Sequence, residues 1–473
     1  MIVSPGGHAP FIGKPETPEQ WLMYLYGRLQ GPRSSAAEYV KYYEGEQQKL
    51  AFSQMRYRHA FSEVFAQWRD NFCGMIVDAS AERLNVDSFR LPESPGTDRD
   101  AREFWQRNSM DAFSGMVHLD TLIRGSAYVA VWADAQGEPT ITPVSSSRMA
   151  VAYKPGSLTE LEAAALFERD AWGRQRVTLW TDRYVYEVPW GATEWHIGAL
   201  NPNPIGVVPV VPFQTRPRLL ADPVSDLANI VPIQDAINKT VSDALTTSEA
   251  AAFPQRTVTG LDIVMDAQGN PVEPFDIGAD KLLQAEDPNA RFGSMPAADL
   301  SNYVALTDML VQHMASISKV PSTYFLVNNA SSAPSGESNL SAEAGLIAKV
   351  RQFMTPLGES WERVIRLCFA VKRDSRKDAF AMETRWKDPE YRTEAQHIDA
   401  LLKQKQLNVP EQVLWAEAGY SATQIETFRA MRLEDARAAA EVQRLMPQPQ
   451  QSPTPKPPQG NSGNGNRRIH ESA

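Results

Sequence analysis

The chain has 473 residues, of which 42% are hydrophobic and 22% charged, and this composition is ordinary for a folded protein of about two to four domains. Its formal net charge of −10 weighs against a protein that holds DNA tightly through the phosphates. The longest apolar runs fall short of the ~20 residues of a membrane-spanning helix, and the N-terminal residues do not read as a signal peptide, so we expect neither membrane insertion nor secretion.

The first 225 residues predict a mixed α/β region. Apolar side chains recur at helical spacing over residues 17–29, 57–84 and 98–124, and Gly125 should end the last of these helices. Strand-like alternation follows, with turn residues between the segments, and predicts hairpins over 127–132, 139–143, 177–180 and 183–188. The prolines of the apolar segment 207–213 favour an edge strand.

The central part predicts two antiparallel helices separated by a Gly/Pro-rich excursion over 253–297. The outgoing helix carries one apolar stripe, formed by Ile230, Ile233, Ile237, Val241 and Leu245. Its opposite face is polar and carries Asp235, Asn238, Lys239 and Ser242. The return helix repeats the apolar pattern with Leu300, Tyr303, Thr307, Leu310, Met314 and Ile317. The excursion of about 45 residues suits a small α/β unit with too little apolar surface to fold alone, so we expect it to pack between subunits.

The C-terminal part predicts a loop and then helices. Residues 322–338 are rich in Ser, Gly and Asn, which indicates a flexible loop that includes Ser332 and Ser335. A long helix should begin near residue 338 and kink at Pro356. Three further helices are expected over 394–407, 410–418 and 421–445, before a Pro/Gln/Ser-rich tail that should be disordered. The predicted fold class is therefore α+β and mainly helical.

The sequence offers no recognisable catalytic, cofactor or metal site. The segment 7–14 differs from a phosphate-binding loop in its glycine spacing and lacks the Ser/Thr, and the seven histidines are scattered. Asp78 and Glu82, one helical turn apart beside Arg83, could serve acid–base chemistry or a metal, but such a set is more often a salt-bridged helix face. Cys73 and Cys368 are expected to be buried free thiols, which suits a reducing cytoplasm. We therefore predict a protein that is not an enzyme and needs no cofactor.

Segments in a characteristic order and spacing carry a family resemblance along nearly the whole chain. They are residues 38–45, 71–89, 125–132, 203–213, 232–240, 253–256, 339–343 and 386–389. On these segments the chain resembles portal proteins of tailed bacteriophages, of the type common in phages of actinobacteria. Two alternatives remain at this point, namely a non-viral helical scaffold or adaptor protein and an enzyme of unknown chemistry.

The resemblance implies a division of the chain into the parts of a portal subunit. Residues 1–225 would form the wing, 226–252 the first stem helix, 253–297 the clip, 298–320 the second stem helix and 321–340 the tunnel loop. Residues 341–390 would form a kinked wing helix and its connection, 391–445 a helical crown and 446–473 a disordered tail.

The resemblance also implies a function and its partners. Such subunits form a ring, usually a dodecamer, at one capsid vertex of the virion, after assembly in the host cytoplasm. The terminase large subunit, a head–tail adaptor protein, and the major capsid protein and scaffold would contact the ring, and double-stranded DNA would pass through it without sequence specificity.

In a ring, the polar face of the first stem helix must meet a neighbour or line the channel, and the channel candidates are Asp235, Asn238, Lys239, Ser242, Ser332 and Ser335. The negative net charge of the protein would help the duplex to slide, because few cations would hold its phosphates.

Overall fold

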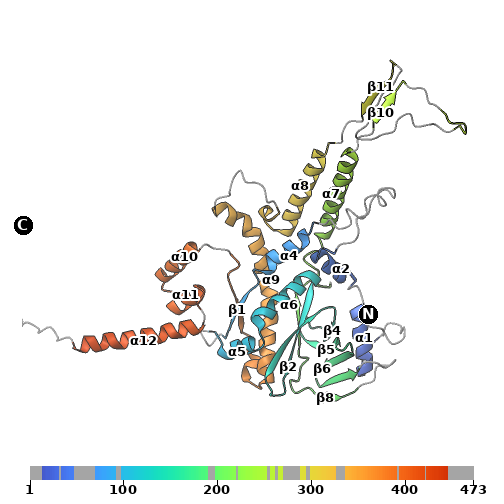
Figure 1. Ribbon diagram of the computed structural model, residues 1–473. Helices are drawn as coiled ribbons and strands as arrows, with labels where there is room; N and C mark the ends of the chain where they lie inside the picture. Colours follow the sequence, from blue (N-terminus) through green and yellow to red (C-terminus); the bar gives the residue numbers. More distant parts are fainter. Residues whose placement is uncertain are drawn as a thin grey trace, which may run out of the picture. The chain divides into compact units, whose positions relative to one another are not determined.

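The computed structural model describes residues 13–30, 34–46, 70–91, 97–189, 198–219, 222–252, 256–260, 265–269, 288–294, 299–325, 336–390, 394–420 and 422–445. Over these residues the fold is α+β and helices predominate, as the sequence predicts (Figure 1). The chain divides into two compact units, Met1–Tyr391 and Arg392–Ala473. None of the helices in the described ranges is long and apolar enough to cross a membrane.

Helices open the first unit. They are α1 (Pro18–Gln30), α2 (Ser34–Tyr43), α4 (Phe72–Ala81), α5 (Arg99–Arg107) and α6 (Met110–Arg124). Asp98 caps α5 by accepting a hydrogen bond from the backbone N–H of Ala101. The prediction of one helix over 98–124 is wrong, because Ser109 takes a left-handed φ of 53° and separates α5 from α6. Gly125 ends α6 as expected, with a φ of 85° that favours glycine.

Antiparallel sheets make up most of the rest of this unit. Strands β3 (Pro139–Ser145), β2 (Ser126–Ala133) and β9 (Val210–Gln214) form a three-stranded sheet in that order, so β9 is the expected edge strand. A five-stranded sheet follows chain order through β4 (Met149–Tyr153), β5 (Leu161–Arg169), β6 (Gln175–Thr181), β7 (Tyr184–Pro189) and β8 (Leu200–Pro202). The sequence patterns predict β2, β3, β6 and β7 but not β4 and β5.

The main core lies where helix α9 (Gly336–Val371) packs on the three-stranded sheet. Trp361 is fully buried there, with ring centroids 4.9 Å from Trp105 and 4.6 Å from Phe213. Its indole Nε1–H donates to Nε2 of the buried His118 at 2.9 Å. The helix includes Pro356, and strand β12 (Glu383–Trp386) beyond it pairs with β1 (Val86–Arg90). A second core lies where α1 packs on β4 and β5, and buries Leu22, Leu25, Leu29 and Phe167.

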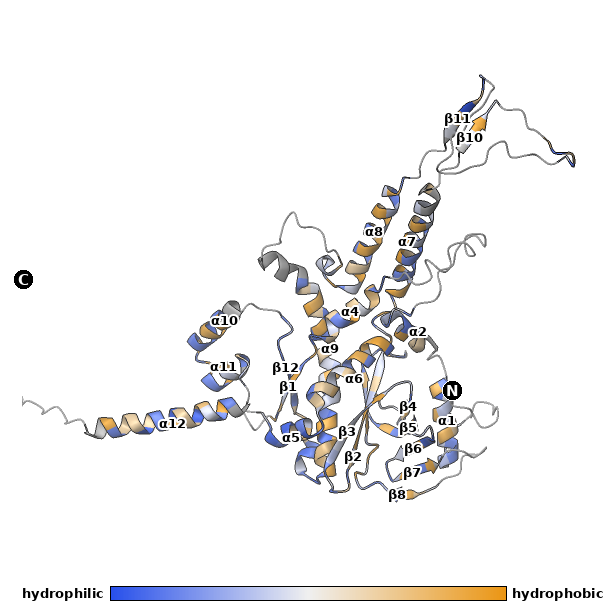
Figure 2. Cartoon of the chain, in the orientation of Figure 1, coloured by the Kyte–Doolittle hydropathy of each residue, from blue (hydrophilic) through white to orange (hydrophobic). Residues whose placement is uncertain are grey.

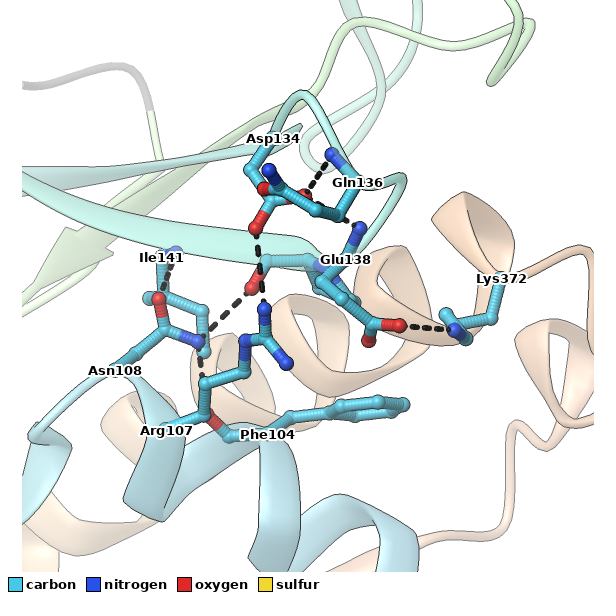
Figure 3. A network of polar contacts seen from close by, with 9 residues as sticks. Phe104, Arg107, Asn108, Asp134, Gln136, Glu138, Ile141 and Lys372 are labelled. Atoms are coloured by element: carbon cyan, nitrogen blue, oxygen red, sulfur yellow. Dashed lines mark hydrogen bonds and ion pairs between the residues drawn. The ribbon is translucent and has the colours of Figure 1, made fainter.

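Polar contacts hold the turn between β2 and β3 against α5 and the end of α9 (Figure 3). The Asn108 side chain donates to the carbonyl of Pro139 at 3.0 Å and accepts from the N–H of Ile141 at 2.9 Å. Lys372, just after α9, pairs with Glu138 at 2.7 Å. These contacts attach the turn between β2 and β3 to the end of α5 and to the end of α9.

A pair of antiparallel helices, α7 (Val231–Ala252) and α8 (Ser301–Ser318), lies side by side (Figure 1). Beyond them, strands β10 (Arg256–Thr259) and β11 (Arg291–Ser294) pair in an antiparallel hairpin. The hydroxyls of Thr247 and Tyr303 meet across the two helices at 3.2 Å. The predicted outgoing and return helices are confirmed, and the described part of the excursion is this hairpin with residues 265–269.

The second unit consists of helices over its described residues. They are α10 (Glu394–Gln406), α11 (Glu411–Glu417) and α12 (Ala422–Leu445), close to the three predicted ranges. The Phe428 ring packs edge-on against Trp415 at 5.6 Å and Tyr420 at 5.1 Å, which joins α11 to α12. The Arg432 guanidinium lies over the Trp415 ring at 4.9 Å.

Some predictions concern residues outside the described ranges. They are the start of the helix expected over 57–84, most of the excursion over 253–297, the centre of the loop expected over 322–338 and the tail over 446–473. The described flanks of that loop are a short 3₁₀ helix, η1 (Ser322–Tyr324), and the first turn of α9.

Candidate functional site

The predicted polar face of α7 divides into an exposed and a buried part. Asp235 is exposed, and both of its carboxylate oxygens accept from the Tyr42 hydroxyl, at 2.8 and 3.0 Å. Lys239 is half-buried and forms an ion pair with Asp243 one turn further along the helix. Among the described side chains of this helix, two carboxylates and one ammonium therefore lie on its accessible side, and the ammonium is paired with Asp243.

Asn238 and Ser242 lie on the buried part, with only 4% and 1% exposure. Within the chain they therefore do not share an accessible surface with Asp235 and Lys239, although all four belong to the predicted polar face. Their place along a channel stays a prediction. Ser332 and Ser335 lie outside the described residues.

Gln234, which the sequence analysis does not single out, organises that buried part. Its amide nitrogen donates to the carbonyl of Asp70 at 2.9 Å and to Oδ1 of Asn238 at 3.2 Å. Its Oε1 accepts from the N–H of Phe72 at 3.2 Å, at the start of α4. The i, i+4 spacing of Gln234 and Asn238 beside the buried Ile237 is the signal in the sequence that could have indicated an inward-facing polar pair.

The predicted apolar stripe of α7 is confirmed at Ile230 and Ile237, which are 1% and 0% exposed. The stripe of α8 is confirmed only in part. Met314 is fully buried, but Ile317 is 52% exposed. Leu306 and Met309 are 41% and 44% exposed, and their helical spacing puts them on the same side of α8 as Ile317. Figure 2 shows hydrophobic residues along much of α8. Helix α8 thus presents apolar side chains that the rest of the chain does not cover.

Burial and the nearby Asp235 carboxylate raise the pKa values of two groups at the base of α7. Burial, and then the hydrogen bond to Asp235, raise the pKa of the Tyr42 hydroxyl. Burial, with a smaller contribution from Asp235, raises the pKa of the Cys73 thiol to about 12, so this free cysteine is inert at neutral pH. Cys368 is also a buried free thiol, and both predictions for the cysteines are confirmed.

A cavity of about 510 Å³ lies beside α4, and Asp78 and Glu82 are among its lining residues. The Tyr43 hydroxyl donates to Asp78 at 3.0 Å, and Arg83 reaches the Tyr324 hydroxyl at 2.8 Å and Glu343 at 3.5 Å. Asp78 and Arg83 therefore bind different partners. Among the described residues no group of His, Cys, Asp and Glu side chains could hold a metal ion.

Comparison with known proteins decides the family. Residues 33–440 match the family described as phage portal protein, SPP1 Gp6-like. The chain belongs to this family of phage portal proteins. The family match confirms the resemblance drawn from the sequence and removes the support for a non-viral scaffold or adaptor.

Two curated portal proteins are similar to the chain. The portal protein of Mycobacterium phage D29 is 28% identical over 387 residues, which cover 76% of this chain and 78% of that protein. The portal protein of Mycobacterium phage L5 is 28% identical over 391 residues, with the same coverage. Both phages infect actinobacteria, in agreement with the type of portal that the sequence segments indicate.

Two solved structures show weaker similarity, at 13% sequence identity. They are the virion of a native gene transfer agent particle, with a TM-score of 0.41 over 82% of this chain and 95% of the other, and the neck of an empty gene transfer agent particle, with a TM-score of 0.43 over 83% and 98%.

Proposed function

We propose that this portal-family chain is one subunit of a closed ring, usually of twelve copies, that forms a DNA channel at one vertex of a phage capsid. The ring would serve packaging of the genome by a terminase motor, joining of head to tail, and ejection of the genome. Its role would be structural, with hydrolysis left to the motor. Family membership supports the general role, and the uncovered apolar side of α8 is the observation that carries the ring.

The exposed side of α8 fits contact with a neighbouring subunit. Leu306, Met309 and Ile317 each leave about half of their surface open to solvent. Covering half of such a side chain stabilises an interface by about 1 kcal/mol, so the three together contribute roughly 3 kcal/mol per contact. A closed ring repeats this contact at every subunit and leaves no α8 uncovered.

The regions of the subunit receive their proposed roles from the same reasoning. The α7–α8 pair would be the stem, the β10–β11 hairpin part of the clip, and the unit of α10, α11 and α12 the crown. A two-stranded hairpin is marginally stable by itself, which supports a clip that packs between subunits. The clip would face the terminase large subunit during packaging and the head–tail adaptor afterwards. The wing would meet the major capsid protein and scaffold.

The accessible part of α7 is the proposed channel surface within the stem. Asp235 and Asp243 outnumber Lys239 there, and Lys239 is paired with Asp243. Such a surface offers few free cations to phosphates, so counterion release would give little binding energy and the duplex could slide. Ser332 and Ser335 remain proposed tunnel-loop positions, and photocrosslinkers placed there should react with DNA held in the channel rather than with capsid protein alone.

The experiment that tests the ring is the mass of the assembled particle together with electron microscopy of the purified chain. Leu306→Lys combined with Met309→Lys should give folded subunits that no longer close into rings, because both charges would be buried at the contact. Leu158→Lys is the matched control, since Leu158 is 76% exposed in the turn between β4 and β5. Compact monomers from the unmodified chain, or normal rings from the α8 variant, would contradict the proposal.

A further inference from the structure

A buried ion pair lies at the base of the two stem helices. Nζ of Lys349, in α9, lies 2.5 Å from Oδ2 of Asp226, and their side chains are only 3% and 1% exposed. The other carboxylate oxygen of Asp226 accepts from the Arg216 guanidinium at 2.6 Å. The Lys349 ammonium also donates to the backbone carbonyl of Ser318 at 3.1 Å.

The partners of this one ammonium belong to separate parts of the fold. Ser318 is the last residue of α8, and Asp226 lies in the segment that leads into α7. The backbone N–H of Asp226 donates in turn to the carbonyl of Leu122, near the end of α6, at 3.0 Å. Lys349 therefore joins the end of one stem helix, the entry to the other and the long helix of the wing.

Stability alone does not explain a charged pair at this place. Removing an ammonium and a carboxylate from water costs several kcal/mol per ion, and an apolar pair of similar volume is often equally stable or more stable. An apolar side chain, however, could not bind the carbonyl at the end of α8. Lys319 follows Ser318 in a left-handed conformation with a φ of 61°, so the helix ends sharply where Lys349 holds it.

We infer that the Lys349–Asp226 pair is a positioning device that fixes the ends of α7 and α8 against α9, and that it contributes specificity of arrangement rather than net stability. Both ions have directional partners, so a shift of α8 by one residue would move the Ser318 carbonyl away from the ammonium. Since the contacts lie within one subunit, this inference does not depend on the proposed ring.

The test compares single and double substitutions in the full-length chain. Asp226→Leu leaves the buried Lys349 ammonium without its carboxylate, and Lys349→Met leaves Asp226 with Arg216 as its only ion-pair partner, whereas the double variant removes both buried ions. Arg216 can then turn to water, because 39% of its side chain is already exposed. The exposed pair Arg90–Glu383 is the matched control, because it also joins two elements and its double substitution to Met and Leu should change nothing.

Urea unfolding and hydrogen exchange read out the result. Each single variant should unfold at lower urea, and the double variant should recover the midpoint of the unmodified chain. The amides of residues 319–325, apart from Pro321, should nevertheless exchange about 10-fold faster or more in the double variant, while those of β5 and β6 stay unchanged. Unchanged exchange at 319–325 would show that the pair does not position α8. A double variant as weak as the single variants would show that the pair acts through stability.

Discussion

His118 should make this protein sensitive to mild acid. The ring is fully buried between Trp361 and Trp386, and burial lowers its pKa from about 6.5 to about 4, with a weaker opposing contribution from the backbone of Leu84. Trp361 donates to Nε2, so that nitrogen must keep its lone pair. The unfolded chain binds the proton first as pH falls, and the folded state therefore loses stability between pH 6.5 and 4. The loss is about 2 kcal/mol at pH 5 and about 3 kcal/mol in total below pH 4.

The assay is the free energy of unfolding from urea titrations between pH 7.5 and 4.5, for the unmodified chain and for His118→Gln. Glutamine can still accept the indole N–H of Trp361 but does not titrate. Carboxylates titrate in both proteins, so the difference between the two curves isolates the histidine. That difference should be flat above pH 7 and should change by more than 1 kcal/mol per pH unit near pH 5.5. Parallel losses in both proteins would refute the burial argument.

Other expected outcomes concern the channel, the clip and one turn. Asp235→Lys should steepen the dependence of DNA retention on salt by about 0.9 in logarithmic slope per added phosphate contact. Tyr42→Phe removes the same hydrogen bond without adding charge and should leave that slope unchanged. Identical salt curves for Asp235→Lys and the unmodified chain, with intact rings, would show that this surface does not meet DNA. Deleting residues 253–297 should leave a folded wing that forms no stable rings. Size-exclusion chromatography and electron microscopy measure this, and rings of normal stability would show that the clip is dispensable. Gly125→Ala should lower the free energy of unfolding by more than 1 kcal/mol, because φ is 85° and the added Cβ would lie 2.9 Å from the backbone of Val224; an unchanged urea midpoint would contradict this.

Hydrophobic periodicity predicts well where one face of an element meets the core. The stripe with Ile230 and Ile237 locates α7, and the alternation after Gly125 locates β2 and β3. The same approach misses β4 and β5, because Ala163, Ala164 and Ala165 are residues typical of helices. In the structure these alanines are fully buried in the five-stranded sheet, two of them in the core that includes α1. Tertiary packing overrides their intrinsic propensity.

The candidate site is predictable only in part for a related reason. A sequence pattern separates polar from apolar positions on α7, but it does not show which of the polar positions the rest of the chain covers, such as Gln234, which contacts the start of α4. Asn238 and Ser242 are buried although their residue types are those of a solvent-facing surface. Asp235 and Lys239 remain accessible because no element of the described chain covers them completely.

The position of Trp361 in the main core has a consequence for synthesis on the ribosome. Its partners His118 and Phe213 lie in elements that are made early, and 243 residues separate His118 from Trp361. About 150 residues follow Phe213 before Trp361 is made, which takes roughly 7 to 30 s at ~5 to 20 residues per second. During that interval the three-stranded sheet lacks the helix that covers it, whereas the core under α1 needs only residues made before β8. Nascent chains should therefore bind holdase chaperones through the exposed face of β2 and β9, and release should follow translation of α9.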